Sequence, residues 1–201
     1  MASTVKQEQV NLGRSVATRE LPDTDRCMGL DQVLVQKQYT RVPFLLQNGL
    51  ESKAGVMLAK EDKRTIAVLL RLSGPVHISS VDVYMVSSYF QYRVEIDLHL
   101  DYLERVLKVL HGQQILIRVD CNAHSPLWFC KQSQYIGCGT KVEHRTHRME
   151  SCICGHGLII HNTEGQPTTF SGPGGESNID LTLITRIVTI TEWQVQVHQF
   201  Q

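Results

Sequence analysis

Residues 115–126 read Ile-Leu-Ile-Arg-Val-Asp-Cys-Asn-Ala-His-Ser-Pro, and no other stretch says more about the fold. Residues 115–119 are apolar apart from Arg118, which predicts a buried strand. The strand ends on the carboxylate of Asp120 and, two residues later, the amide of Asn122. The end of a strand is a place where a rigid sheet can hold a general base and a hydrogen-bonding partner together, close to a substrate phosphate.

The composition fits a single intracellular domain. With 201 residues, of which 42% are hydrophobic and 20% charged, the chain is long and apolar enough for one core. Basic and acidic residues balance to zero formal net charge, so any contact with a polyanion must be local. No run approaches the roughly 20 apolar residues of a membrane span. The six cysteines form no CxxC pair, which indicates reduced thiols. We expect no membrane partner.

Hydrophobic spacing indicates a mixed α/β chain. Apolar residues recur every three or four positions between Ile96 and His111, and Gly112 follows, which predicts a helix. A second helix is expected over 143–157, and a turn over 164–167. Short apolar or alternating runs predict strands at 33–35, 65–72, 81–90, 115–119, 158–161, 179–184 and 193–197. Together these elements predict sheets with helices outside them, as in a two-sheet sandwich.

A second polar motif precedes another apolar strand. Residues 172–177 read Gly-Pro-Gly-Gly-Glu-Ser, and this glycine-rich loop leads into Asn178 and Asp180. Asp and Asn are also common in turns, where their side chains bond nearby backbone amides. That local role explains either motif taken alone equally well. Two such strand ends in one chain favour a shared functional site.

Six blocks of the sequence together resemble a known family. They are residues 10–15, 34–40, 87–91, 120–128, 164–170 and 172–183. In order and spacing they resemble the endonuclease/exonuclease/phosphatase superfamily, and more narrowly the endonuclease domain of arthropod non-LTR (LINE-type) retrotransposons. The resemblance implies one domain over 1–201, a four-layer α/β sandwich of two packed mixed β-sheets flanked by helices. It also implies Mg²⁺-dependent cleavage of DNA phosphodiesters, a nuclear location and a parent polyprotein containing a reverse transcriptase.

The resemblance further implies a role for each matching residue. Asn11 corresponds to an asparagine near the metal ion, and Tyr89 to a tyrosine that touches the scissile phosphate. Asp120 corresponds to the aspartate that positions or deprotonates the attacking water, and Asn122 to the asparagine that orients that water. Asp180 matches the acid that supports the family's catalytic histidine. These residue types suit the chemistry, because Mg²⁺ prefers oxygen ligands and a water nucleophile needs a carboxylate within reach.

Two departures from the family pattern bear on activity. Where the family has its main metal-binding glutamate, this chain has Lys37, whose ammonium offers no lone pair and repels a cation. The sequence also stops at Gln201 without the family's Ser-Asp-His block, so we expect a C-terminally truncated fold in which Asp180 lacks its histidine. Since groups that act as a unit lose most activity when one is removed, we predict impaired catalysis. Asn178 and Ser125 complete the expected substrate contacts.

Two alternative functions remain open. The first is a non-catalytic module on the same fold that binds nucleic acid or another protein. The second is a phosphoesterase of the same superfamily that acts on small molecules. We consider the phosphoesterase the less favoured alternative, because the sequences of residues 122–128 and 175–180 resemble the retrotransposon branch of the superfamily.

Other polar clusters are expected to have structural roles. The histidines and cysteines between 144 and 161 fit no regular zinc-binding spacing, so surface and packing roles are favoured over a metal site. Lys141, Arg145 and Arg148 could touch phosphates, but a solvated helix face is the simpler expectation. The glycines at 172–175 do not form a P-loop, because no Gly-Lys-Ser/Thr follows them.

Overall fold

The chain forms two compact units, Met1–Tyr89 and Phe90–Gln201. The structure, a computed structural model, describes residues 6–11, 29–36, 83–131, 139–172 and 175–195. It also describes the backbone of four short strands at 46–47, 55–58, 66–69 and 76–79.

The first unit contains a mixed sheet with the order β1-β2-β4-β3. β1 (Gln7–Asn11) runs parallel to β2 (Gln32–Gln36), and β2 pairs antiparallel with β4 (Gly55–Leu58), which also pairs with β3 (Leu46–Gln47). Every residue of β2 is buried, which agrees with its predicted apolar run. β1 reads Gln-Glu-Gln-Val-Asn, and because it is mostly polar, hydrophobic spacing in the sequence did not predict it.

A second sheet packs against the first within the same unit. β5 (Ile66–Leu69), β6 (Val76–Ser79) and β7 (Tyr84–Tyr89) form an antiparallel meander. β7 packs against β2, and the contact includes polar groups. The buried Gln36 donates from Nε2 to Ser87 Oγ at 3.1 Å, and Ser87 Oγ donates to the carbonyl of Val35 at 3.3 Å. The first unit is therefore a small two-sheet sandwich with hydrogen bonds in its core.

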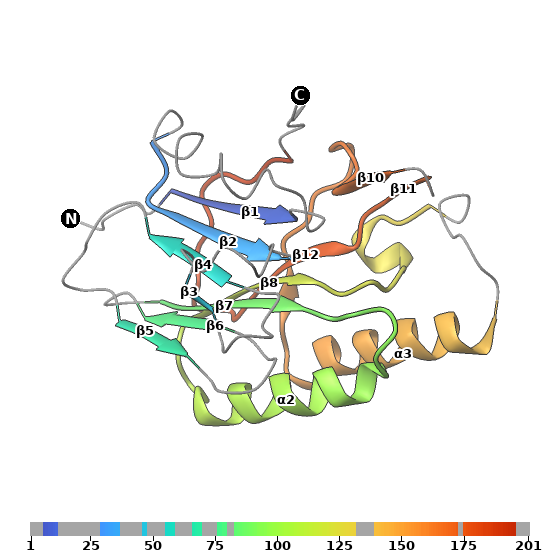
Figure 1. Cartoon of the computed structure of the whole chain (residues 1–201), viewed down its shortest axis with the longest axis horizontal. Coiled ribbons are helices and arrows are strands. Elements are labelled where there is room, and N and C mark those ends of the chain that lie inside the picture. Colours follow the sequence, from blue (N-terminus) through green and yellow to red (C-terminus); the bar gives the residue numbers. More distant parts are fainter. Residues whose placement is uncertain are drawn as a thin grey trace. The chain divides into compact units, whose positions relative to one another are not determined.

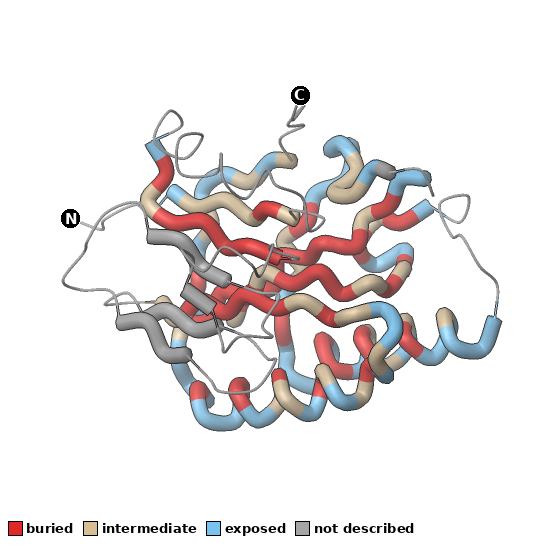
Figure 2. Tube along the Cα trace, in the orientation of Figure 1, coloured by how far each residue is buried: buried red, intermediate tan, exposed pale blue. Residues whose placement is uncertain are grey.

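The second unit contains an antiparallel sheet with β12 at its centre. β8 (Ile115–Asp120) and β9 (Ile159–Ile160) pair with β12 (Asp180–Ile184) on its two sides. A hairpin of β10 (Phe170–Gly172) and β11 (Gly175–Ser177) precedes β12, and the short 3₁₀ helix η2 (Pro126–Trp128) follows β8. Figure 2 shows that β8 and β12 are buried along most of their length.

Two helices pack side by side on this sheet (Figure 1). α2 (Ile96–Val109) buries one apolar stripe, formed by Ile96, Leu100, Leu103, Val106 and Leu107. This stripe has the spacing expected of a helix that covers a sheet with one face. α3 (Thr140–Gly155) buries Met149, Cys152 and Ile153, together with one arginine. Both predicted helices are confirmed, with α3 starting and ending a few residues earlier than expected.

The structure confirms the predicted α/β class and corrects one predicted strand. Residues 193–195 are not extended in a sheet, although alternation had predicted a strand over 193–197, and residues 196–197 lie outside the described part. The Trp193 side chain is attached instead through its ring, whose Nε1 donates to Thr182 Oγ1 at 2.9 Å. Side-chain anchoring therefore replaces backbone pairing here.

Among the described residues, no helix combines the length and the apolar character needed to span a bilayer.

Candidate functional site

The register of β8 and β12 places Asp120 directly opposite Asp180. Just beyond this pair, the N–H of Cys121 donates to the carbonyl of Ile179 at 2.9 Å. Bonded and non-bonded pairs alternate in an antiparallel ladder, so Asp120 and Asp180 form a non-bonded pair. In such pairs the Cα atoms lie about 4.5 Å apart and the side chains share one face of the sheet. Two acids that are 60 positions apart in the sequence thus become neighbours.

Both of these carboxyl groups are buried, which makes their proximity costly. Asp120 has no exposed surface and Asp180 is only 7% exposed. Like charges directly opposite each other on neighbouring strands destabilise a sheet, and burial raises that cost unless a proton, a donor or a cation neutralises them. Such arrangements are concentrated at functional sites. The end of β8 is therefore the candidate site.

Asn122 is held in the unusual backbone conformation that the end of β8 requires. Its φ is +46°, in the left-handed region that Asn tolerates better than most residues. Its backbone N–H donates to Asp120 Oδ1 at 3.3 Å, and its Nδ2 donates to the carbonyl of Phe90 at 3.0 Å. The N–H of Phe90 in turn donates to the carbonyl of Asp120 at 2.9 Å. Both predicted residues at this strand end are thus fixed by backbone partners.

Arg145 clamps the same backbone from α3. Its side chain is 2% exposed, and its guanidinium donates to four backbone carbonyls. Nε donates to Cys121 at 3.1 Å, Nη2 to Phe90 at 2.8 Å and to Gln91 at 3.5 Å, and Nη1 to Val94 at 3.2 Å. Burial lowers the pKa of Arg145 from its ordinary value. One side chain therefore joins the residue between Asp120 and Asn122 to the segment that begins at Phe90.

The expectation of a solvated basic face is wrong for Arg145. Its neighbours do fit that expectation, because Arg148 and Lys141 are 36% and 49% exposed and pair with acids on the surface. Hydrophobic spacing in the sequence did not distinguish the buried Arg145 from its exposed basic neighbours, because an arginine is counted as polar wherever it lies. The spacing to Met149, four residues later and fully buried, was the available signal.

Asn178 and Ser125 lie near this strand end, where their side chains bind the protein itself. The amide of Asn178 donates to the carbonyl of Phe129 at 3.0 Å and accepts from the N–H of Thr169 at 3.1 Å. Ser125 is fully buried, donates to Glu150 Oε1 at 2.5 Å and caps η2 by accepting a backbone N–H. These bonds hold both side chains in place, and their direct contact with substrate stays a prediction.

Cys121 stands between the two key residues but is not a nucleophile. Burial raises the pKa of its thiol far above the ordinary value, and the nearby carboxylates of Asp120 and Asp180 add to that shift. Its Sγ donates to the carbonyl of Ile179 at 3.1 Å. The thiol is therefore a protonated packing group, as the interpretation of the cysteines as reduced thiols requires.

The remaining predicted residues belong to the other unit. Asn11 ends β1 and Tyr89 ends β7, and both are half-buried. Lys37 lies outside the described residues, directly after the buried Gln36. Asn11 and Tyr89 thus lie at strand ends in the first unit, as Asp120 does in the second.

Comparisons with known proteins identify the family. A family model for endonuclease-reverse transcriptases matches residues 83–201, more than half of the chain, so the chain belongs to that family. The retrovirus-related Pol polyprotein from type-1 retrotransposable element R1 of Bradysia coprophila is 29% identical over 148 residues. That match covers 73% of this chain but only 14% of the polyprotein.

Solved structures show the same fold. The endonuclease domain of TRAS1, a telomere-specific non-LTR retrotransposon, matches with a TM-score of 0.70 and 22% identity, over 91% of this chain and 86% of that domain. An AP endonuclease from Archaeoglobus fulgidus matches with a TM-score of 0.61 and 12% identity, over 90% of this chain and 87% of that one. These matches confirm the predicted α/β sandwich class and the resemblance to non-LTR retrotransposon endonuclease domains.

Proposed function

We propose that this chain is a DNA-directed phosphodiesterase domain of a non-LTR retrotransposon polyprotein, with its catalytic residues at the end of β8. The observation that carries the proposal is the buried pair of Asp120 and Asp180, flanked by Asn122. Two buried acids directly opposite each other weaken a sheet, whereas a phosphodiesterase needs a carboxylate that takes a proton from water. Family membership and the TRAS1 fold agree with this chemistry.

Within that function, each side chain would have one task. Asp120 would accept the proton of the attacking water, and Asn122 would hold the water and a phosphate oxygen. Tyr89 would contact the scissile phosphate. The sheet hydrogen bonds and Arg145 already fix the backbone of Asp120 and Asn122. These residues would therefore lose little conformational entropy when substrate binds.

The donor set also fits Mg²⁺. The proposed site residues in the described part of the chain offer carboxylate, amide and phenol oxygens, and a hard divalent cation prefers such ligands over nitrogen or sulfur. Of these residues, we propose Asn11 as a ligand. When bound, Mg²⁺ would polarise the phosphate and stabilise the leaving oxygen.

We further propose that cleavage is impaired because Lys37 occupies the position of the expected glutamate ligand. A charged ammonium at that position repels Mg²⁺ and supplies no lone pair. Supercoiled-plasmid nicking with Mg²⁺ tests the proposal. We expect the unaltered chain to nick the plasmid slowly and the Lys37→Glu variant to nick it at least about tenfold faster. The double variant Lys37→Glu with Asp120→Ala should show no nicking. Robust nicking by the chain as printed that Asp120→Ala abolishes would show that catalysis is intact.

Lys37 also favours a second candidate, a module that binds DNA without cleaving it. The ammonium would replace part of the metal's charge and attract a phosphate directly. Filter binding of a short duplex should then be weaker for Lys37→Ala than for the chain as printed, at equal salt. Equal affinity of the two proteins would remove this candidate.

The partners and location follow from the same proposal. The R1 relative is a Pol polyprotein, and this chain spans about one seventh of its length. We propose that the domain works beside a reverse transcriptase in such a polyprotein and reaches chromosomal DNA in the nucleus.

A further inference from the structure

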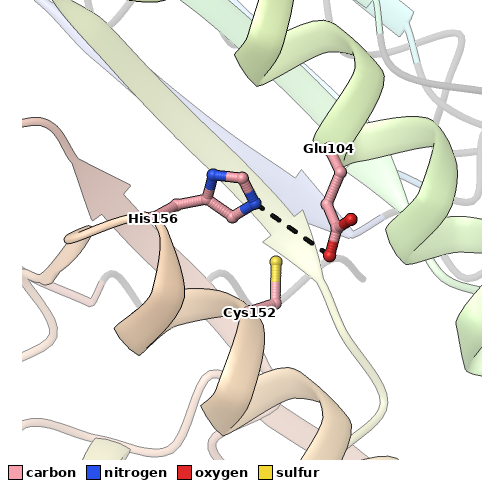
Figure 3. A group of neighbouring side chains, drawn as sticks. All are labelled: Glu104, Cys152 and His156. Atoms are coloured by element: carbon pink, nitrogen blue, oxygen red, sulfur yellow. Dashed lines mark ion pairs between the residues drawn. The ribbon is translucent and has the colours of Figure 1, made fainter.

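A group of metal-binding side chain types lies between α2 and α3 (Figure 3). Glu104 comes from α2, Cys152 lies on α3, and His156 is the residue that caps the C-terminus of α3. Their ligand atoms all lie within 4.8 Å of one another, and His156 Nε2 is 4.0 Å from Glu104 Oε1. None of the three belongs to the strand-end site, and the sequence favoured surface and packing roles over a metal site for Cys152 and His156.

The backbone explains why these atoms converge. Cys152 and His156 are four residues apart, so they occupy the same side of α3. α2 packs beside α3 and brings Glu104 to that side. In a tetrahedral zinc site, bond lengths of about 2.0–2.3 Å place the ligand atoms roughly 3.3–3.8 Å apart. Small rotations of two half-exposed side chains, Glu104 and His156, would close the remaining gap.

We propose that Glu104, Cys152 and His156 bind one divalent cation of the zinc type, with water as the fourth ligand. The choice of metal follows from the ligands, because thiolate and imidazole prefer Zn²⁺ and similar ions, whereas Mg²⁺ and Ca²⁺ require oxygen ligands. The site would thus be chemically distinct from an oxygen-only site at the end of β8. Its effect would be to fasten α2 to α3 beside the long ion pair of His156 and Glu104, in addition to the ion pairs that Asp97 of α2 makes with α3.

The surroundings give the cation access and an open position. Glu104 and His156 line an open groove of about 720 Å³, together with Asp101 and His111. Lys108 and Arg105 also line it and balance part of the acidic charge. Cys152 is 5% exposed, so its sulfur would be the buried ligand of the site, beside the two half-exposed ones. Burial raises the pKa of Cys152 to about 11, so an incoming cation must displace the thiol proton.

Cobalt and zinc binding test the proposal on the whole chain under reducing conditions. Co²⁺ should give the visible bands of tetrahedral coordination and a sulfur-to-cobalt charge-transfer band, which Zn²⁺ should displace. A competing chelator then gives the Zn²⁺ affinity, and a hundredfold excess over Kd should raise Tm by about 5–10 °C. Cys152→Ser should abolish the charge-transfer band, and His156→Gln and Glu104→Gln should each weaken Zn²⁺ binding at least about tenfold.

Matched controls come from the same helix. Cys154→Ser and His147→Gln change exposed side chains of the same types outside the group, and both should bind Zn²⁺ like the unaltered chain. If Cys152→Ser fails to fold, the exposed His156→Gln variant still decides the question. Absence of Zn²⁺ binding, or binding that His156→Gln and Glu104→Gln leave unchanged, would overturn the proposal.

Discussion

The end of β8 and the outer side of α3 both gather polar side chains, but they hold them in opposite ways. At the end of β8 the side chains are buried and their partners are mainly backbone groups, as in the bonds of Asn122 and Arg145 to the carbonyl of Phe90. On the outer side of α3, side chains pair with half-exposed side chains, as Arg148 does with Asp97. Backbone partners cannot change rotamer, so the first region is fixed, whereas the second can adapt to what binds it.

Replacing each of the two arginines of α3 should give the largest difference in stability between the two regions. Arg145→Met leaves buried carbonyls without a donor and should cost about 3–5 kcal/mol, which lowers Tm by roughly 8–15 °C. Arg148→Met removes only a surface ion pair and should cost less than about 1 kcal/mol. Thermal and urea unfolding of both variants measure these values. Equal losses would mean that the buried clamp is not what holds the strand end.

Acid should weaken the fixed region through His99, which stacks on Phe90 with ring centroids 5.0 Å apart. Burial, and then the charge of Arg145, lowers the pKa of His99 from 6.5 to about 4. Since the folded pKa lies below the unfolded one, the stability is present above pH 6.5 and is lost as the pH falls through 4. We expect Tm to fall by about 5 °C more in the unaltered chain than in His99→Phe over this range. Parallel pH profiles would contradict this.

Two substitutions at Asn122 sharpen the role of its backbone conformation. Asn122→Ala loses the bond to Phe90 and places a Cβ at a φ of +46°, whereas Asn122→Gly loses the same bond without the steric penalty. We expect the Gly variant to be about 1 kcal/mol more stable than the Ala variant. If urea unfolding ranks the two the other way, the left-handed conformation is not retained when the side chain is removed.

The smallest effect concerns thiol reactivity and changes no stability. Cys154 is exposed, whereas Cys121 is fully buried with a raised pKa. Because the thiolate is the reactive form, iodoacetamide should modify Cys154 at least about a hundredfold faster than Cys121 in the folded chain. Peptide mapping after short exposure separates the two. Fast modification of Cys121 would show that the end of β8 opens readily.

Local patterns in the sequence determined the elements. The three-and-four spacing of apolar residues predicted α2, and the apolar run at 115–119 predicted β8, because each pattern depends only on residues a few positions apart. The same reasoning found Asp120 and Asn122, which directly follow that run. It missed β1, whose side chains are mostly polar, and it predicted a strand over 193–197, of which the described residues 193–195 are not in a sheet and Trp193 is anchored by its ring.

Only the tertiary structure decided which of these residues meet. The register between β8 and β12 sets Asp180 opposite Asp120, and the packing of α2 on α3 sets Glu104 beside Cys152. Packing also buried Arg145 and left Arg148 at the surface of the same helix. Such contacts join segments that are far apart in the sequence, and their energies depend on burial and register that no local pattern encodes. The sequence by itself therefore determined most of the elements and the candidate residues Asp120, Asn122 and Asp180, and the fold decided which side chains become neighbours.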